Sequence, residues 1–157
     1  MARAITAIVI HCSASPNGKP VTRDDIDRWH REKGWRMIGY HRVVEIDGAI
    51  KVGRHLKEVG AHVAGQNAHT VGICMIGTDQ FTMEQWGALA TLVSELLMLY
   101  PDANVLGHRD YSPDLNGDGI IEPWEFFKTC PGFDVSAWRQ GGFQPPIGHV
   151  IDAWKLD

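Results

Sequence analysis

The chain has 157 residues, of which 44% are hydrophobic, and a formal net charge of −4 at neutral pH. A chain of this size can bury one good core but hardly two, so we expect a single domain. We also expect a monomer. The negative charge excludes a general electrostatic attraction to nucleic acid or to anionic membranes, and we expect neither nucleic-acid binding nor stable membrane insertion.

The first half of the chain predicts a strand, a helix and a hairpin. The apolar run over residues 4–11 is too short to span a bilayer and is typical of a strand rather than a signal peptide, which predicts a cytoplasmic protein. Thr22 and Asp25 form a helix-capping pattern, and Gly34 is a suitable stop for that helix. Residues 40–53 read as a hairpin, in which Asp47-Gly48 predicts a tight primed turn.

The second half continues with alternating strands and helices. Residues 71–77 and 103–108 predict two strands, and the segment from Thr82 to Tyr100 predicts a long core helix that starts at a capping box. A short helix capped by Asp134 follows. The expected fold is therefore α/β, with a mixed central β-sheet flanked by helices.

We expect the chain to divide into one folded domain, residues 1–140, and a tail, residues 141–157. The tail places four apolar residues at helical spacing, which predicts a short amphipathic helix docked on the domain. These four are Ile147, Val150, Ile151 and Trp154.

Three residues far apart in the sequence form a candidate metal site. His11 and His108 each end a predicted strand, and Cys130 follows in a loop. Taken singly, each is more often a surface or core residue, and Cys130 alone is equally consistent with an inert buried thiol. Together, two imidazoles and one thiolate suit a catalytic zinc ion that keeps one position open.

Longer motifs surround these residues. HCSAS comes near the start, GYHRVVEIDG follows, GAHVAGQNAHTVGICMIG lies in the middle, and GHRD and KTCPGFD come late. Over residues 4–139 this order resembles the type 2 N-acetylmuramoyl-L-alanine amidases, above all the amidase-type lysozymes (endolysins) of short-tailed coliphages. Peptidoglycan recognition proteins share that fold.

The resemblance implies a zinc-dependent hydrolase that cleaves the lactyl–L-alanine amide bond of bacterial peptidoglycan. It implies zinc at His11, His108 and Cys130, and catalytic assistance from Tyr40 and Lys128. A second pair, His62 and Asn67, matches a motif that lines the substrate cleft in the family.

Strand alternation predicts where the neighbours of these residues point. Because successive side chains on a strand face opposite sides, His41 should point away from the side that Tyr40 faces, and Cys12 away from that of His11. We expect Cys12 and Cys74 to be small buried residues.

A second metal signal lies between the last two zinc candidates. Residues 114–125 fit the EF-hand calcium-loop pattern, although Pro113 precludes a normal entering helix and the chain has no partner EF-hand. The alternative is a turn rich in Asp, Asn and Gly that happens to fit. The expected calcium ligands are Asp114, Asn116, Asp118, the carbonyl of Ile120, Glu122 and Glu125.

Other functions compete with the zinc enzyme. A recognition protein that binds peptidoglycan without cutting it is the main alternative, but such proteins generally lack the ligand cysteine. A wall-recycling amidase usually presents aspartate where Cys130 stands. The coliphage likeness also suggests a phage RNA polymerase as a partner, which nothing in the sequence independently supports.

We expect a phage endolysin that is made in the host cytoplasm and acts on the cell wall after release, while a prophage remnant or an effector remains open.

Overall fold

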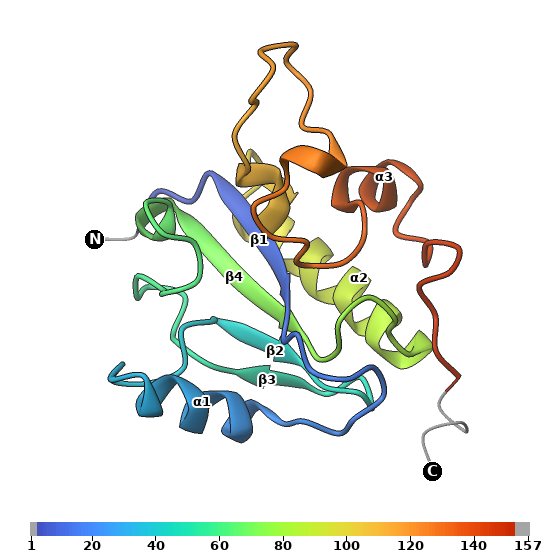
Figure 1. Cartoon of the computed structure of the whole chain (residues 1–157). Helices are drawn as coiled ribbons and strands as arrows, with labels where there is room; N and C mark the ends of the chain where they lie inside the picture. The colour runs from blue at the N-terminus through green and yellow to red at the C-terminus, as the bar shows by residue number, and fades with distance from the viewer. Residues whose placement is uncertain (1–2, 153–157) are drawn as a thin grey trace.

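The computed structural model describes residues 3–152 and is built around a five-stranded sheet with the order β3-β2-β4-β1-β5 (Figure 1). Strands β1, β2, β4 and β5 are parallel where they pair, and β3 pairs with β2 in the antiparallel direction. The strands are β1 (Ala7–Cys12), β2 (Arg42–Val44), β3 (Ile50–Val52), β4 (Thr70–Met75) and β5 (Asn104–Gly107). The mixed α/β architecture predicted from the sequence is confirmed.

The two faces of the sheet bury different sets of side chains. Ile8, Ile10 and Cys12 pack on one face with α2 (Met83–Leu99) and α3 (Val135–Gln140), in the larger core cluster. The opposite face carries Val9 and His11, and α1 (Arg23–Glu32) covers another part of that face. The predicted separation of Cys12 from His11 is therefore confirmed, and the functional face is the one that α2 does not cover.

The helices begin where local sequence chemistry predicts. Thr22 and Asp25 exchange side-chain and backbone hydrogen bonds in a capping box at α1, and Thr82 and Gln85 do the same at α2. The Asp134 side chain accepts a hydrogen bond from the Ala137 backbone at α3. These caps pair backbone N–H groups that the first turn of a helix leaves without partners. Each helix start is therefore determined by residues only three positions apart.

The hairpin forms as predicted, but its predicted primed turn is wrong. The Glu45 N–H donates to the carbonyl of Ala49 at 2.9 Å, and the Gly48 N–H donates to the carbonyl of Glu45 at 2.8 Å. Gly48 has a φ of +85°, whereas Asp47 keeps a negative φ and its side chain accepts from the Ala49 N–H. The connection is thus a three-residue loop that ends in a left-handed glycine.

The predicted helix in the tail is wrong for the residues that the structure describes. Residues 147–152 contain no helix, and Val150 instead forms a parallel bridge with Phe81. Gly148 has a φ of +85°, which interrupts a right-handed helix. Trp154 lies outside the described residues. The tail nevertheless docks on the domain as expected, since the Trp86 indole donates to the carbonyl of His149.

Within residues 3–152, no helix is both long and apolar enough to cross a membrane.

Candidate active site

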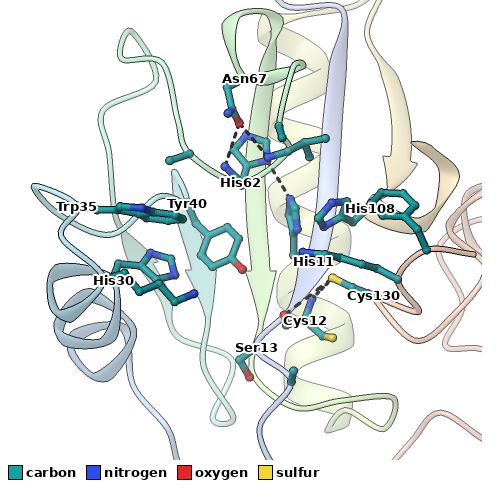
Figure 2. A pocket seen from close by; sticks show the side chains of 17 residues that line it. His11, Cys12, Ser13, His30, Trp35, Tyr40, His62, Asn67, His108 and Cys130 are labelled. Carbon is teal, nitrogen blue, oxygen red and sulfur yellow. Dashed lines mark hydrogen bonds between the residues drawn. The ribbon is translucent and has the colours of Figure 1, made fainter. Parts of the chain in front are cut away.

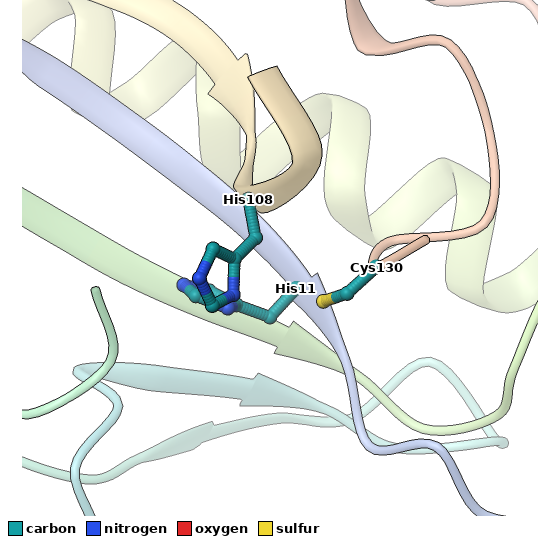
Figure 3. A group of neighbouring side chains, drawn as sticks. All are labelled: His11, His108 and Cys130. Carbon is teal, nitrogen blue, oxygen red and sulfur yellow. The ribbon is translucent and has the colours of Figure 1, made fainter. Parts of the chain in front are cut away.

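His11, His108 and Cys130 meet at the carboxyl ends of two neighbouring parallel strands (Figure 3). His11 is the penultimate residue of β1, and His108 directly follows β5. Each of the three offers a ligand atom, and these atoms lie within 4.8 Å of one another. The predicted convergence of the three residues is confirmed.

Cys130 is held by contacts at the ends of two strands, since Cys12 is the last residue of β1 and Arg109 lies two residues after β5. The Cys12 N–H donates to the Cys130 sulfur at 3.1 Å, and the Arg109 N–H donates to the Cys130 carbonyl at 2.8 Å. Gly107 allows the loop to approach, because a Cβ there would lie 2.7 Å from Cδ of Pro131. The cysteine is therefore placed by packing against the ends of β1 and β5.

Burial favours the neutral forms of these three residues. Burial, followed by the neighbouring His62, His108 and Lys128, holds the pKa of His11 well below its usual value, and burial lowers the pKa of His108 to about 4. Both imidazoles are thus neutral at pH 7 and can offer lone pairs. The side-chain hydrogen bond with the Cys12 thiol, and then burial, raise the pKa of Cys130, so a thiolate there needs a neighbouring positive charge. Neutral imidazoles and a thiolate fit the ligand preference of Zn²⁺.

The three residues line a cleft of about 610 Å³ (Figure 2). Tyr40 faces them across the cleft, with its ring centroid 5.0 Å from that of His11, and its hydroxyl points toward the side where His11 and Cys130 lie. Lys128 is exposed and also lines the cleft. The structure therefore brings both predicted catalytic residues to the candidate metal site.

Tyr40 is a neutral phenol in this environment. Burial and then the nearby thiols of Cys74, Cys130 and Cys12 raise its pKa well above 10. A phenol with a raised pKa keeps its proton at neutral pH and acts as a hydrogen-bond donor.

His62 and Asn67 lie in the loop that forms one wall of the cleft. The Asn67 side-chain oxygen accepts from the backbone N–H groups of His62 and Val63, both at 2.9 Å, and so shapes the loop. His62 contacts the candidate ligand His11 directly, with 2.9 Å between His62 Nδ1 and His11 Nε2. The prediction that His62 and Asn67 bind substrate stays a prediction.

His41 lies outside the residues that line the cleft. It is fully buried, its Nδ1 accepts from the Gly72 N–H at 3.0 Å, and its Nε2 lies 2.8 Å from the Glu58 carbonyl. Tyr40 and His41 thus diverge as strand alternation predicted.

The far end of the cleft was not predicted from the sequence. His30, Lys33 and Trp35 line it, with Lys33 Nζ 5.5 Å from the Trp35 ring centroid. These residues cluster at the end of the predicted first helix, just before the GYHRVVEIDG motif. That clustering could have indicated that they contribute to the site. Among residues 3–152, the cleft lining includes two lysines and no carboxylate.

The candidate calcium loop brings three carboxylates together. Asp114, Asp118 and Glu125 offer oxygens within 4.8 Å of one another. Asn116 orients the loop through its side-chain oxygen, which accepts from the Asp118 N–H at 3.2 Å. Hydrogen bonds with Asp118 and then Glu125 raise the pKa of Glu122 to about 7, which reflects the crowding of acidic groups.

Residues 1–133 match the family described as N-acetylmuramoyl-L-alanine amidase. The chain is 34% identical over 141 residues to an endolysin of Enterobacteria phage K11, with 85% of this chain and 84% of that protein covered. It is also 46% identical over 113 residues to an uncharacterized protein of Haemophilus influenzae, with 67% of this chain and 97% of that protein covered.

Solved structures show the same fold. The endolysin LysCS of Clostridium intestinale, an N-acetylmuramoyl-L-alanine amidase, aligns with a TM-score of 0.71 at 26% identity, over 90% of this chain and 86% of that one. Drosophila peptidoglycan recognition protein LB aligns with a TM-score of 0.69 at 23% identity, over 96% of this chain and 85% of that one. The chain belongs to the N-acetylmuramoyl-L-alanine amidase family.

Proposed function

We propose that this protein is a zinc-dependent N-acetylmuramoyl-L-alanine amidase that hydrolyses the lactyl–L-alanine amide bond of bacterial peptidoglycan, and that it serves as a phage endolysin. The observation that carries the proposal is the convergence of His11, His108 and Cys130 in a cleft that also contains Tyr40 and Lys128. The endolysin relatives support the biological setting.

The residues of the cleft have different roles in the proposed reaction. Bound zinc supplies Lewis acidity, which makes water a better nucleophile and the amide carbonyl a better electrophile at neutral pH. Tyr40 donates a hydrogen bond from its phenol and orients the attacking water or the carbonyl oxygen. The Lys128 ammonium stabilises the negative charge that develops on the carbonyl oxygen in the transition state.

The charge of the cleft suits the proposed substrate. Stem peptides carry free carboxylates, and the cleft lining includes Lys33 and Lys128. A carboxylate of a peptide bound in the cleft can pair with one of these cations, and the described lining residues include no carboxylate that would repel it. The cleft can therefore attract an acidic peptide although the chain as a whole is acidic.

The alternative is a recognition protein that binds peptidoglycan without cutting it. A binding protein does not need three metal-ligand side chains in its cleft, and here Cys130 completes the set. We therefore prefer the enzyme. A phage RNA polymerase partner is suggested by the coliphage likeness alone, and we do not propose it.

We further propose that residues 114–125 bind calcium. The convergence of Asp114, Asp118 and Glu125 supports this, as does the raised pKa of Glu122, because a cation would relieve the crowding of carboxyl groups. Asn116 and the Ile120 carbonyl would add oxygen ligands. Calcium would order the chain between His108 and Cys130 and so lower the entropic cost of assembling the zinc site.

Zinc dependence can be tested by removal and replacement of the metal. The purified protein should contain close to one zinc ion per chain, lose peptidoglycan hydrolysis after chelation, and regain it when zinc is restored. His108→Ala should bind no zinc and show no activity after the same treatment. The matched control is His55→Ala, because His55 is an exposed histidine outside the cleft lining. Full hydrolysis by metal-free protein would contradict the proposal.

A further inference from the structure

A chain of hydrogen bonds runs from the loop that carries His62 to the candidate zinc ligand His11. The Thr70 hydroxyl donates to the Gln66 carbonyl at 2.9 Å, and its oxygen lies 3.3 Å from His62 Nε2. His62 Nδ1 in turn lies 2.9 Å from His11 Nε2 (Figure 2). Each of the two imidazoles is therefore linked to the next group through a defined nitrogen.

The donor and acceptor in each of these hydrogen bonds follow from the bond between Thr70 and Gln66. A carbonyl can only accept, so the single Thr70 hydroxyl hydrogen is directed at Gln66, and the Thr70 oxygen can only accept from His62 Nε2. A neutral His62 with its hydrogen on Nε2 presents a bare Nδ1. That bare nitrogen accepts from His11 Nε2–H. A neutral His11 is then left with its lone pair on Nδ1.

Packing holds the His62 ring in this orientation. A Cβ at Gly72 would lie 2.6 Å from Cγ of His62, and a Cβ at Gly60 would lie 2.7 Å from its Cδ2. The ring thus occupies a slot that two glycines leave open. On the backbone side, Asn67 accepts the His62 N–H. His62 is therefore anchored at its main chain and at its far nitrogen, and its ring packs against two glycines.

We propose that His62, oriented by Thr70, is a positioning residue that fixes His11 in the tautomer protonated on Nε2, so that Nδ1 is the nitrogen available to zinc. The inference rests on the proposed zinc function. Without a partner, a neutral imidazole exchanges its hydrogen between the two nitrogens, and only one form offers the correct lone pair. Groups that orient a metal-ligating histidine in this way typically contribute 10- to 100-fold to metal affinity.

This role differs from the role in substrate binding that the sequence suggested for His62. A substrate-binding residue affects peptidoglycan affinity or turnover but leaves zinc affinity and the His11 tautomer unchanged. A positioning residue changes zinc affinity in the absence of any substrate. The two roles therefore separate in measurements made without peptidoglycan.

The first test is nitrogen-15 NMR of the imidazoles in the zinc-free wild-type protein. The side-chain nitrogen shifts should show His11 and His62 each protonated on Nε2. A His11 protonated on Nδ1 overturns the proposal. This measurement needs neither zinc nor a variant, so it stands even if the proposed zinc enzyme fails for another reason.

The second test measures zinc affinity by competition with a chelator. His62→Leu removes the acceptor and should weaken zinc binding by about 10- to 100-fold. His62→Asn places an amide oxygen near the position of Nδ1 and should restore most of that affinity. His55→Leu, a substitution of an exposed histidine, should leave zinc affinity unchanged. Thermal melting confirms that each variant is folded.

The outcomes distinguish the two roles of His62. Weaker zinc binding by His62→Leu, with affinity restored in His62→Asn, supports the positioning role. A folded His62→Leu that binds zinc as tightly as wild type but loses hydrolysis overturns it in favour of direct substrate contact. Absence of zinc binding in the wild type refutes the proposed function, while the NMR result still decides the tautomer.

Discussion

His41 should make the stability of this protein depend on pH in a defined window. Its ring is fully buried, Nδ1 accepts from the Gly72 N–H, and Nε2–H donates to the Glu58 carbonyl. Protonation would place a hydrogen on Nδ1 facing another donor. Burial lowers the pKa of His41 to about 4; the hydrogen bond to the Glu58 carbonyl opposes this shift, and the nearby arginines add smaller contributions to it.

The sign and size of the effect follow from that pKa. The unfolded chain binds a proton at His41 below about pH 6.5, whereas the folded protein does so only below about pH 4. The free energy of unfolding therefore falls as pH drops through this window, and the stabilisation is complete above it. A shift of this size corresponds to about 3 kcal/mol in total, or up to about 1.4 kcal/mol per pH unit.

The assay is urea unfolding of zinc-free wild type and His41→Asn between pH 4.5 and 7.5. The asparagine oxygen can accept from Gly72 but cannot titrate, and the Glu58 contact is lost. We expect the variant to be less stable at pH 7.5 by about 1–3 kcal/mol and the difference to shrink or reverse by pH 4.5. Parallel stability curves for the two proteins would refute this reasoning.

Three further substitutions test the site and the loop beside it. Tyr40→Phe removes a donor at the reacting centre and should lower kcat by roughly 100- to 1000-fold while zinc content is unchanged; an active Tyr40→Phe would exclude this role. Gly107→Ala adds a Cβ that would lie 2.7 Å from Pro131, so zinc affinity measured by chelator competition should fall, and unchanged affinity would show that the Cys130 loop tolerates the shift. Asp118→Ala should abolish any rise in melting temperature on addition of calcium, and equal melting of the wild type with and without calcium would refute calcium binding.

The parts of the fold that local chemistry determines could be predicted from the sequence. Thr22, Asp25, Thr82 and Gln85 cap helices through contacts only three residues apart, so the pattern alone is sufficient. The type of hairpin turn was harder to predict. The Asp47 side chain accepts a hydrogen bond from the Ala49 N–H, which favours a three-residue loop over the primed turn.

The tail shows the limit of periodicity as a guide. Val150 and its neighbours have helical spacing, but Gly148 has a positive φ and the segment pairs with Phe81 instead. Phe81 and Val150 are about 70 residues apart in the sequence, and their tertiary contact outweighs the local helical pattern. Helical spacing alone could not have predicted this pairing.

The candidate site was predictable in its chemistry but less so in its geometry. His11, His108 and Cys130 were identified by residue type and by their motifs, and parallel strands bring them together. The contact between His62 and His11 depends on how a loop packs over Gly72, which no spacing in the sequence indicates. The sequence motif for His62 suggested substrate contact and gave no sign of this second link.

The central claim is amide hydrolysis that depends on the three converging side chains. The most direct measurement is digestion of purified peptidoglycan by the zinc-loaded protein and by Cys130→Ala, scored for new L-alanine amino termini and for new sugar reducing ends. We expect new L-alanine termini from the wild type alone and no new reducing ends from either protein. Equal release of L-alanine termini by Cys130→Ala, or new reducing ends from the wild type, would contradict it.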